Sequence, residues 1–339
     1  MKAIDVNDLS KIYKGAIKAI DHLSFDVDEG NIFGFLGPNG AGKSTTIKIL
    51  VTLTRPTQGS AHLFNVDVLK EPSKIREMIG YVPQELSADG ALTGYENLLL
   101  SAKLYNIPPS DRQLRIEKIL TMMDLSQRAH SLVDTYSGGM VRRLEIGQAM
   151  LHHPRLLFLD EPTIGLDPGG RKLVWEHIRK LNTEEQMTIF LTTHYMEEAE
   201  ELCDHIGIID NGTLSIVGSP QELKEKVGVG TITFVLSPPQ LGQYTTADLN
   251  SLFTHIPIAS LIQLSSDTWQ AKISHPAEYV PEFFQTFQRK NIHVKDLEVK
   301  GPTLEDVFLK FTGSNFDQSG SPNEWKNIKK RRRTIRRIT

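Results

Sequence analysis

Residues 32–45 read Ile32-Phe33-Gly34-Phe35-Leu36-Gly37-Pro38-Asn39-Gly40-Ala41-Gly42-Lys43-Ser44-Thr45. The last nine residues fit the pattern G-x-x-x-x-G-K-[ST], which describes a loop that binds phosphate groups between a strand and a helix. The apolar run 32–36 predicts a buried parallel strand before the loop. A helix is expected after it, from about residue 43 to 53. The sequence therefore predicts a phosphate-binding loop at the end of a strand.

The residue types in this loop suit a bound phosphate. Gly37, Gly40 and Gly42 carry no Cβ atom, so the backbone can approach an anion closely and adopt positive φ angles. The helix that follows directs its positive N-terminal end at the phosphate. Lys43 supplies a positive charge for the outer phosphates, and Ser44 supplies a hydroxyl oxygen for Mg²⁺.

The 339-residue chain has the composition of a soluble globular protein, with 39% hydrophobic and 23% charged residues. It is long enough for two domains. No stretch approaches the roughly 18 apolar residues of a membrane-spanning helix, and the first residues lack the apolar region of a secretory signal. Cys203 is the single cysteine, so it can form no internal disulfide and is expected to be a small buried hydrophobe. These features predict a cytoplasmic protein.

The net charge of −3 is unevenly distributed, because residues 326–339 carry eight Lys or Arg and no acidic residue. Residues 313–323 are rich in Gly, Ser and Asn and predict a linker, so 313–339 is expected to be a linker and a disordered basic tail. Three interpretations of the tail stay open, in this order. It is a solvated end without function, an arm attracted to anionic lipid headgroups, or a segment that binds nucleic acid.

Residues 1–228 predict an α/β domain with a parallel sheet and a β-rich beginning. Its expected strands are residues 3–6, 23–27, 32–36, 156–159 and 188–191. The helical pattern 169–182 between the last two strands gives a strand-helix-strand order. Residues 86–135 look mainly helical, with no obvious strand, and predict a helical subdomain.

The pattern changes near residue 228. Residues 229–312 predict a small α+β domain with the order β-α-β-β-α-β. Its expected strands are 231–236, 258–264, 267–273 and 292–299, and its expected helices are 246–254 and 278–290. A dimer-contact or regulatory role for this domain is our hypothesis.

Two adjacent carboxylates, Asp160 and Glu161, follow the apolar run 156–159. In open α/β sheets, ligands bind beyond the carboxyl ends of the strands. Asp160 is expected to hold Mg²⁺ directly or through a water, and Glu161 to accept a proton from an attacking water.

A second anion site is predicted at Ser137-Gly138-Gly139, just before the helical stretch 140–152. Ser137 suits a helix N-cap, and the glycines expose the backbone at a positive helix end. One phosphate group hardly needs both the phosphate loop and a second anion site from the same edge of the sheet. The economical solution is a dimer in which this helix end caps a nucleotide held by the other subunit.

Two further polar residues are candidates for the same site. His194 comes at the end of the run 189–193, where it could hydrogen-bond a terminal phosphate and sense its loss. Gln84 follows Tyr81-Val82-Pro83, and its amide could reach a metal or a water.

These motifs, in this order, resemble the nucleotide-binding subunit of ABC transporters over residues 1–228. The motifs that carry the resemblance are 37–45 as the Walker A loop, Gln84 as the Q-loop residue, 136–140 as the signature motif, 156–161 as Walker B with its catalytic glutamate, 165–167 as the D-loop and His194 as the switch histidine. Tyr13 matches the aromatic residue that stacks on adenine in that family. The implied fold is a P-loop NTPase core of ABC type with a helical subdomain, followed by the small α+β domain.

The sequence departs from the family pattern at three positions. Tyr136 and Met140 stand where the signature motif usually has Leu and Gln, and Gly165 replaces the more common Ala. Met140 lacks an amide, so the polar contact of that position is in doubt. Ser137 and Gly139, which face the phosphate in the family, are kept.

The closing segment 302–309 resembles the end of ATP-binding subunits of ABC-2 type exporters. That branch includes daunorubicin/doxorubicin-resistance ATPases, whose members often carry a small C-terminal domain. Met140 is compatible with the same branch. Its members pair two ATP-binding subunits with separately encoded transmembrane permease subunits.

The resemblance implies an ATPase in which two subunits sandwich two ATP molecules head to tail. The implied site residues are Lys43, Glu161 and His194 for catalysis; Tyr13, 37–45, Gln84, 137–139 and Asp167 for nucleotide binding; and Ser44, Gln84 and Asp160 for Mg²⁺. The helical region 86–135 would bind the permease, which would hold the chain on the cytoplasmic face of the membrane.

Two other functions compete with this interpretation. A soluble ABC ATPase that acts on nucleic acid would account for the basic tail, but such relatives usually hold two nucleotide domains or long coiled coils. This chain has one phosphate loop and no sustained heptads. A regulatory module that binds ATP without turnover is disfavoured by the intact Asp160, Glu161 and His194.

Overall fold

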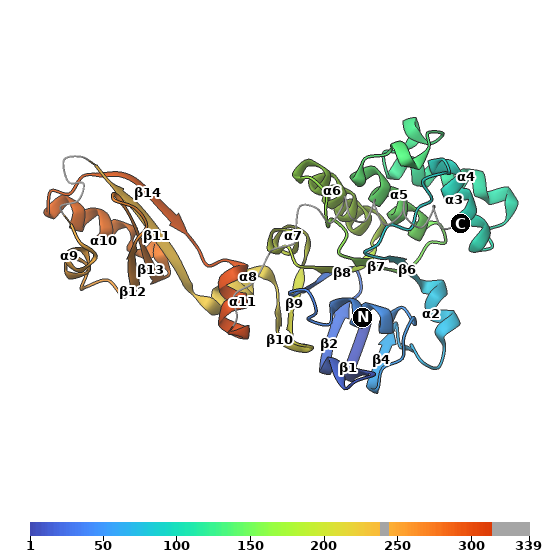
Figure 1. The fold of residues 1–339 in the computed structure, drawn as a ribbon, viewed down its shortest axis with the longest axis horizontal. Coiled ribbons are helices and arrows are strands. Elements are labelled where there is room, and N and C mark those ends of the chain that lie inside the picture. The colour runs from blue at the N-terminus through green and yellow to red at the C-terminus, as the bar shows by residue number, and fades with distance from the viewer. Residues whose placement is uncertain (238–243, 314–339) are drawn as a thin grey trace. The chain divides into compact units, whose positions relative to one another are not determined.

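The structure is a computed structural model that describes residues 1–237 and 244–313. The described residues form two compact units, divided after Pro220 (Figure 1). The predicted basic tail, and the predicted linker beyond Gly313, lie outside the described residues. No helix in the described ranges is long and apolar enough to cross a bilayer.

The first unit contains an antiparallel sheet with the strand order β2-β1-β4-β5. Its strands are β1 (Lys2–Tyr13), β2 (Ile17–Asp28), β4 (Gln58–Leu63) and β5 (Val66–Asp67). Buried and exposed residues alternate along the second half of β2, as expected for a sheet with one face against a core.

A second sheet of the same unit has the order β10-β9-β3-β8-β7-β6. Its strands are β3 (Ile32–Leu36), β6 (Ile79–Val82), β7 (Leu156–Asp160), β8 (Thr188–Thr193), β9 (His205–Asp210) and β10 (Thr213–Gly218). All its neighbouring strands are parallel except β9 and β10. Every residue of β3, β7 and β8 is buried, which explains their continuous apolar runs. The predicted α/β fold with a parallel sheet is confirmed.

The helices of the first unit are α1 (Lys43–Leu50), α2 (Pro72–Met78), α3 (Gly94–Leu104), α4 (Pro109–Met122), α5 (Gly138–Met150), α6 (Pro168–Glu185) and α7 (Met196–Leu202), with 3₁₀ turns η1 (Ser126–Arg128) and η2 (Val133–Thr135). Side-chain caps fix the first residue of two of these helices. Thr93 and Glu96 form a capping box at the start of α3, and the Asp167 side chain caps the start of α6. Residues 86–135 contain helices and turns but no strand, so the predicted helical subdomain is present.

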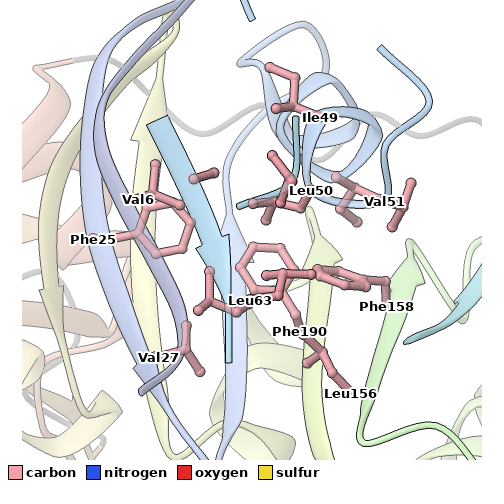
Figure 2. Close-up of a cluster of buried hydrophobic side chains, with 14 of the residues drawn as sticks. Val6, Phe25, Val27, Ile49, Leu50, Val51, Leu63, Leu156, Phe158 and Phe190 are labelled. Atoms are coloured by element: carbon pink, nitrogen blue, oxygen red, sulfur yellow. The ribbon is translucent and has the colours of Figure 1, made fainter. Parts of the chain in front are cut away.

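A hydrophobic core lies between the two sheets of the first unit. Figure 2 shows Val6, Phe25 and Leu63 of the antiparallel sheet gathered with Phe158 and Phe190 of the parallel sheet. Side chains of α1 join the same cluster. The core therefore ties the helix after the phosphate loop to both sheets.

The second unit has the predicted β-α-β-β-α-β order, flanked by one helix on each side. Its elements are α8 (Pro220–Val227), β11 (Val229–Leu236), α9 (Thr246–Leu252), β12 (Ile258–Gln263), β13 (Thr268–Ser274), α10 (Pro276–Arg289), β14 (Val294–Lys300) and α11 (Leu304–Thr312). The antiparallel sheet has the order β12-β13-β11-β14. Alternate residues of β11, such as Phe234, are buried in a core with Leu249 of α9 and Phe283 of α10.

The division between the units falls after Pro220 rather than at the predicted boundary after residue 228. The physical reason is α8, which follows the last strand of the parallel sheet but makes its contacts in the second unit. The Lys310 ammonium group of α11 donates to the carbonyl oxygen of Lys226 in α8, at 2.7 Å.

We predict that Phe190→Ala destabilises the first unit by about 3–5 kcal/mol, because it leaves a cavity in a packed aromatic core. Phe190 is fully buried, with ring centroids 5.6 Å from Phe33 and from Phe158. Urea unfolding followed by circular dichroism measures the change. Leu53→Ala is the control, because Leu53 is 64% exposed and its truncation should leave the transition nearly unchanged. Equal effects of both variants would contradict this description of the core.

Candidate functional site

The site forms where three neighbouring parallel strands end. Strand β8 pairs with β3 on one side and with β7 on the other. Carboxyl ends of parallel strands share one edge of the sheet, so the phosphate loop, Asp160-Glu161 and His194 meet there. Backbone hydrogen bonds fix the three segments together: Gly37 N–H donates to Thr193 O at 3.3 Å, and Glu161 N–H donates to Thr192 O at 3.1 Å.

The phosphate loop depends on its glycines for two different reasons. Gly40 and Gly42 have φ angles of 85° and 105°, in the region that side chains disfavour. The φ angle of Gly37 is not positive, so that part of the prediction is wrong for this residue. A Cβ atom on Gly37 would instead lie 2.2 Å from the carbonyl oxygen of Ile209, so Gly37 is required for a close backbone approach.

Lys43 begins α1 and is only 4% exposed. Its ammonium group donates to the carbonyl oxygens of Gly37 at 2.7 Å and Pro38 at 3.1 Å. The same nitrogen lies 3.2 Å from Glu161 Oε1 in a buried ion pair. The lysine charge is thus held between the phosphate loop and the glutamate.

Ser44 and Asp160 meet at the base of the site. The Ser44 hydroxyl donates to Asp160 Oδ1 at 3.1 Å, and the Thr192 hydroxyl donates to the same oxygen at 2.6 Å. The Thr192 hydroxyl also accepts a hydrogen bond from Glu161 N–H at 3.0 Å. Sequence reasoning missed Thr192, although it belongs to the strand that leads to His194.

Glu161 is the point on which the other polar side chains converge. His194 Nδ1 lies 3.1 Å from Glu161 Oε2, and the Gln84 amide donates to that oxygen at 3.3 Å. Together with Lys43, these groups surround a carboxylate that is 4% exposed. Its backbone has a φ of 48°, a left-handed conformation that few non-glycine residues adopt and that is often found at functional sites.

The two adjacent carboxyl groups have opposite pKa shifts. Burial raises the pKa of Asp160, and the hydrogen bonds from Thr192 and Ser44 offset this only in part. Burial also acts to raise the pKa of Glu161, but the hydrogen bond from His194 and the charge of Lys43 outweigh it, so its pKa lies below the ordinary value. The site therefore keeps Glu161 ionised, whereas the charge of Lys43 acts only weakly on Asp160 and does not offset its burial.

These residues fit Mg²⁺ and a triphosphate. Oxygen atoms of Ser44 and Asp160 lie together, which suits a hard cation that also takes phosphate oxygens as ligands. Within residues 1–237 and 244–313, no three His, Cys, Asp or Glu side chains form a metal-ligand cluster, so a cation here would need the Ser44 hydroxyl and substrate oxygens besides the Asp160 carboxylate. His194 Nε2 is buried and has no hydrogen-bond partner in the described part of the chain, which leaves it for a substrate oxygen.

Tyr13 lies at the end of β1 and is 40% exposed. The ammonium group of Lys11 lies 5.0 Å from the centre of its ring. An exposed ring at this position is accessible to a stacking base.

The signature residues and Asp167 form a second group. Ser137 caps α5 by accepting a hydrogen bond from Met140 N–H, and Asp167 caps α6 by accepting one from Gly170 N–H. A Cβ atom on Gly139 would lie 3.6 Å from Gly170, so the two helix N-termini are close together. In the described ranges, no hydrogen bond or ion pair joins Ser137 or Asp167 to the cluster around Glu161.

A buried ion pair that sequence reasoning missed holds the Gln84 segment. Arg142 lies 3.1 Å from Glu145 on α5, and it donates to the carbonyl oxygens of Pro83 and Gln84. Glu145 accepts backbone hydrogen bonds from Ser87 and Ala88. Helix α5, which Ser137 caps, thus forms hydrogen bonds with the backbone before and after Gln84.

We predict that Gly37→Ala destabilises the first unit more than Gly40→Ala and weakens ATP binding more strongly. The Gly37 substitution forces a side chain against a backbone carbonyl, whereas a Cβ atom on Gly40 meets nothing within 4 Å and adds only φ strain, about 1–2 kcal/mol. Thermal unfolding and titration with a fluorescent ATP analogue measure both effects. The reverse order would contradict the stated role of Gly37.

Comparisons with known proteins show the family of the chain. The family model described as "ABC transporter" matches residues 20–164. The linearmycin resistance ATP-binding protein LnrL of Bacillus subtilis is 36% identical, over 91% of this chain and 98% of that protein. The daunorubicin/doxorubicin resistance ATP-binding protein DrrA of Streptomyces peucetius is 36% identical, over 93% of this chain and 94% of that protein. The Nod factor export ATP-binding protein I of Rhizobium etli is also 36% identical, over 94% and 96%.

Solved structures with a similar fold are also ATP-binding cassettes. An ATP-binding subunit of an ABC transporter is 30% identical, with a TM-score of 0.59 over 67% of this chain and 93% of that chain. The dimeric post-hydrolysis state of the ATP-binding cassette MJ0796, bound to ADP and Pi, is 27% identical, with a TM-score of 0.58 over 64% of this chain and 98% of that chain. These relatives favour the exporter over the nucleic-acid and regulatory alternatives. The chain therefore belongs to the ABC transporter family, as an ATP-binding and ATP-hydrolysing subunit of an exporter.

Proposed function

We propose that Glu161 is the general base of ATP hydrolysis, and that Lys43 and His194 bind and orient the γ-phosphate. The observation that supports this assignment is the convergence of Lys43, His194 and Gln84 on one buried carboxylate. In the reaction, the oxygen of a water forms a bond to the γ-phosphorus while the bond from that phosphorus to the bridging oxygen of ADP breaks. Glu161 takes a proton from the attacking water. A depressed pKa keeps it ionised, as a proton acceptor must be.

The remaining polar groups bind and orient the triphosphate. Backbone N–H groups of the phosphate loop and the N-terminus of α1 would hold the phosphates. Ser44, Asp160 and Gln84 would hold Mg²⁺, directly or through water, and the cation would neutralise charge on the phosphate oxygens. Thr192 fixes Asp160 and the Glu161 backbone together, so both carboxyl groups keep one arrangement.

We propose that a second copy of the chain completes each site. Ser137, Gly138 and Gly139 would contact the phosphates of the ATP bound by the partner, and Asp167 would lie at the same interface. This arrangement is supported by the side chains of Ser137 and Asp167, which cap their own helices and, among the described residues, form no hydrogen bond or ion pair with the Glu161 cluster. Loss of the γ-phosphate would remove a bridge between the subunits and let them part.

The transmembrane partners of this exporter are proposed to be separately encoded permease subunits, which would hold the chain at the cytoplasmic face of the membrane. The helical region 86–135 is the proposed contact. Exposed leucines on α3 and α4 support it, because Leu104 and Leu114 are 75% and 73% exposed. The cargo is proposed to be a small molecule, as for the relatives named for drug resistance and Nod factor export. Attraction of the basic tail to anionic lipid remains a prediction.

Glu161→Gln tests the catalytic assignment. The amide keeps the size and shape of the side chain but cannot accept the proton, so we expect ATP to bind while turnover falls by about 10²–10⁴-fold. Single-turnover hydrolysis of radiolabelled ATP and size-exclusion chromatography with ATP measure turnover and trapping of a dimer. Glu197→Gln, an exposed glutamate outside the site, is the control. Normal turnover in Glu161→Gln would show that another group is the base.

Mixing two inactive variants tests whether sites are completed by the partner. A Lys43→Ala chain and a Ser137→Arg chain form a mixed dimer in which one site carries both defects and the other carries none. Random pairing should therefore restore up to about one quarter of the wild-type sites. ATP hydrolysis and trapping of ADP together with vanadate after one turnover are the readouts.

Lys43→Ala mixed with Glu161→Gln is the matched control for that experiment. Both changes lie in the same cluster, so every mixed dimer would carry one defect in each site and no intact site. Restored activity in the control, or none in the first mixture together with normal dimer formation, would contradict completion by the partner.

A further inference from the structure

Glu198 is a buried carboxyl group that the proposed mechanism does not use. It lies in α7, is fully buried, and has no Lys or Arg within ion-pairing distance in the described part of the chain. Burying an acidic group without a cation is costly. Burial raises the pKa of Glu198, and hydrogen bonds from Thr163, Thr193 and Trp175 offset this only in part. Its hydrogen bonds therefore have to compensate for its burial.

One oxygen of Glu198 joins two other segments. The Thr163 hydroxyl donates to Glu198 Oε1 at 2.6 Å, and the Trp175 indole N–H donates to the same oxygen at 2.9 Å. Thr163 lies in the segment between Glu161 and Asp167, and Trp175 lies in α6, which begins immediately after that segment. Glu198 thus holds the segment at its middle and through the helix that follows.

Backbone hydrogen bonds connect Thr163 to both ends of the segment between Glu161 and Asp167. Ile164 N–H donates to Glu161 O at 3.3 Å, and Leu166 N–H donates to Thr163 O at 3.1 Å, so the chain from 161 to 166 forms linked turns. Helix α7, which carries Glu198, follows directly after the turn that contains His194. Two contacts join the segment 161–167 to the segment that runs from His194 into α7. The first is the contact of His194 with Glu161, and the second is the Glu198–Thr163 hydrogen bond.

We propose that Glu198 is a positioning residue for hydrolysis, which acts as a hydrogen-bond acceptor and holds Thr163 so that Glu161 and His194 keep their relative placement. This inference rests on the catalytic role proposed for Glu161. The Glu198–Thr163 hydrogen bond also connects the helix after His194 to the segment that ends at Asp167. A displacement of either one would therefore move the other. The link requires an acceptor oxygen at Oε1 and no negative charge.

Glu198→Gln and Glu198→Ala separate the acceptor from the charge. The glutamine carbonyl can accept both hydrogen bonds, so we expect kcat within about twofold of wild type. Alanine removes the acceptor, so we expect kcat to fall about 10- to 100-fold through misplacement of Glu161, while KM changes by less than about threefold. Glu197→Ala, on the exposed face of the same helix, is the matched control and should keep both constants.

Thr163→Val supplies the independent test if Glu198→Ala folds poorly. Valine keeps the shape of threonine but cannot donate, so kcat should fall with KM nearly unchanged. In the double variant Thr163→Val/Glu198→Ala, the loss should be smaller than the product of the single losses, because both remove one interaction. Thermal unfolding and binding of a fluorescent ATP analogue establish that each variant is folded.

Three outcomes would overturn the proposal. The first is a wild-type kcat in both Glu198→Ala and Thr163→Val. The second is an equal decrease in kcat in Glu198→Gln and Glu198→Ala. The third is a change in KM and in the folded fraction without a decrease in kcat. Glu161→Gln measured in parallel distinguishes this failure from that of the underlying function. If Glu161→Gln is inactive and Glu198→Ala is normal, only the positioning role fails. If Glu161→Gln is normal, the catalytic role of Glu161 fails.

Discussion

The buried ion pair between Lys43 and Glu161 is the interaction on which the rest of the site depends. Removing both charges from water is expensive, so the surrounding structure must supply partners for each. Loop carbonyls accept from Lys43, and His194 and Gln84 contact Glu161. Those groups lie in the segments that follow four consecutive strands of the sheet, β3, β8, β7 and β6, so the sheet order is a condition for the chemistry.

The second constraint is geometric. The helix N-terminus at Ser137 is capped and accessible, yet it belongs to a group of residues apart from the ion pair. Arg142 and Glu145 connect that helix to the Gln84 segment, so the residues offered to a partner and a residue near Glu161 share one rigid support. In the proposed dimer, each ATP site would combine the Lys43–Glu161 cluster of one copy with the Ser137 helix end of the other. This explains why association of two copies is central to the proposed mechanism.

Much of the fold and site could be predicted because the signals are local. The strand before the phosphate loop, the buried strands that end at Asp160 and before His194, and the cap at Ser137 are all visible in short stretches. Thr192, Glu198 and Arg142 could not be found this way, because their partners lie far away in the chain. The positive φ predicted for Gly37 is wrong, and the close contact that requires a glycine there, with the carbonyl of Ile209 on β9, could not be predicted from local sequence. The short strand β6 and the placement of α8 likewise depend on tertiary contacts.

The most direct test of the account is the specific ATPase activity of the purified wild-type chain, measured with Mg²⁺ over a wide range of protein concentration. If each site is completed by a second copy, activity per chain should rise with concentration and level off as the dimer forms, in step with the dimer fraction from analytical ultracentrifugation. Activity per chain that stays constant down to concentrations where the protein is monomeric would show that one chain contains a complete site, and would contradict the account.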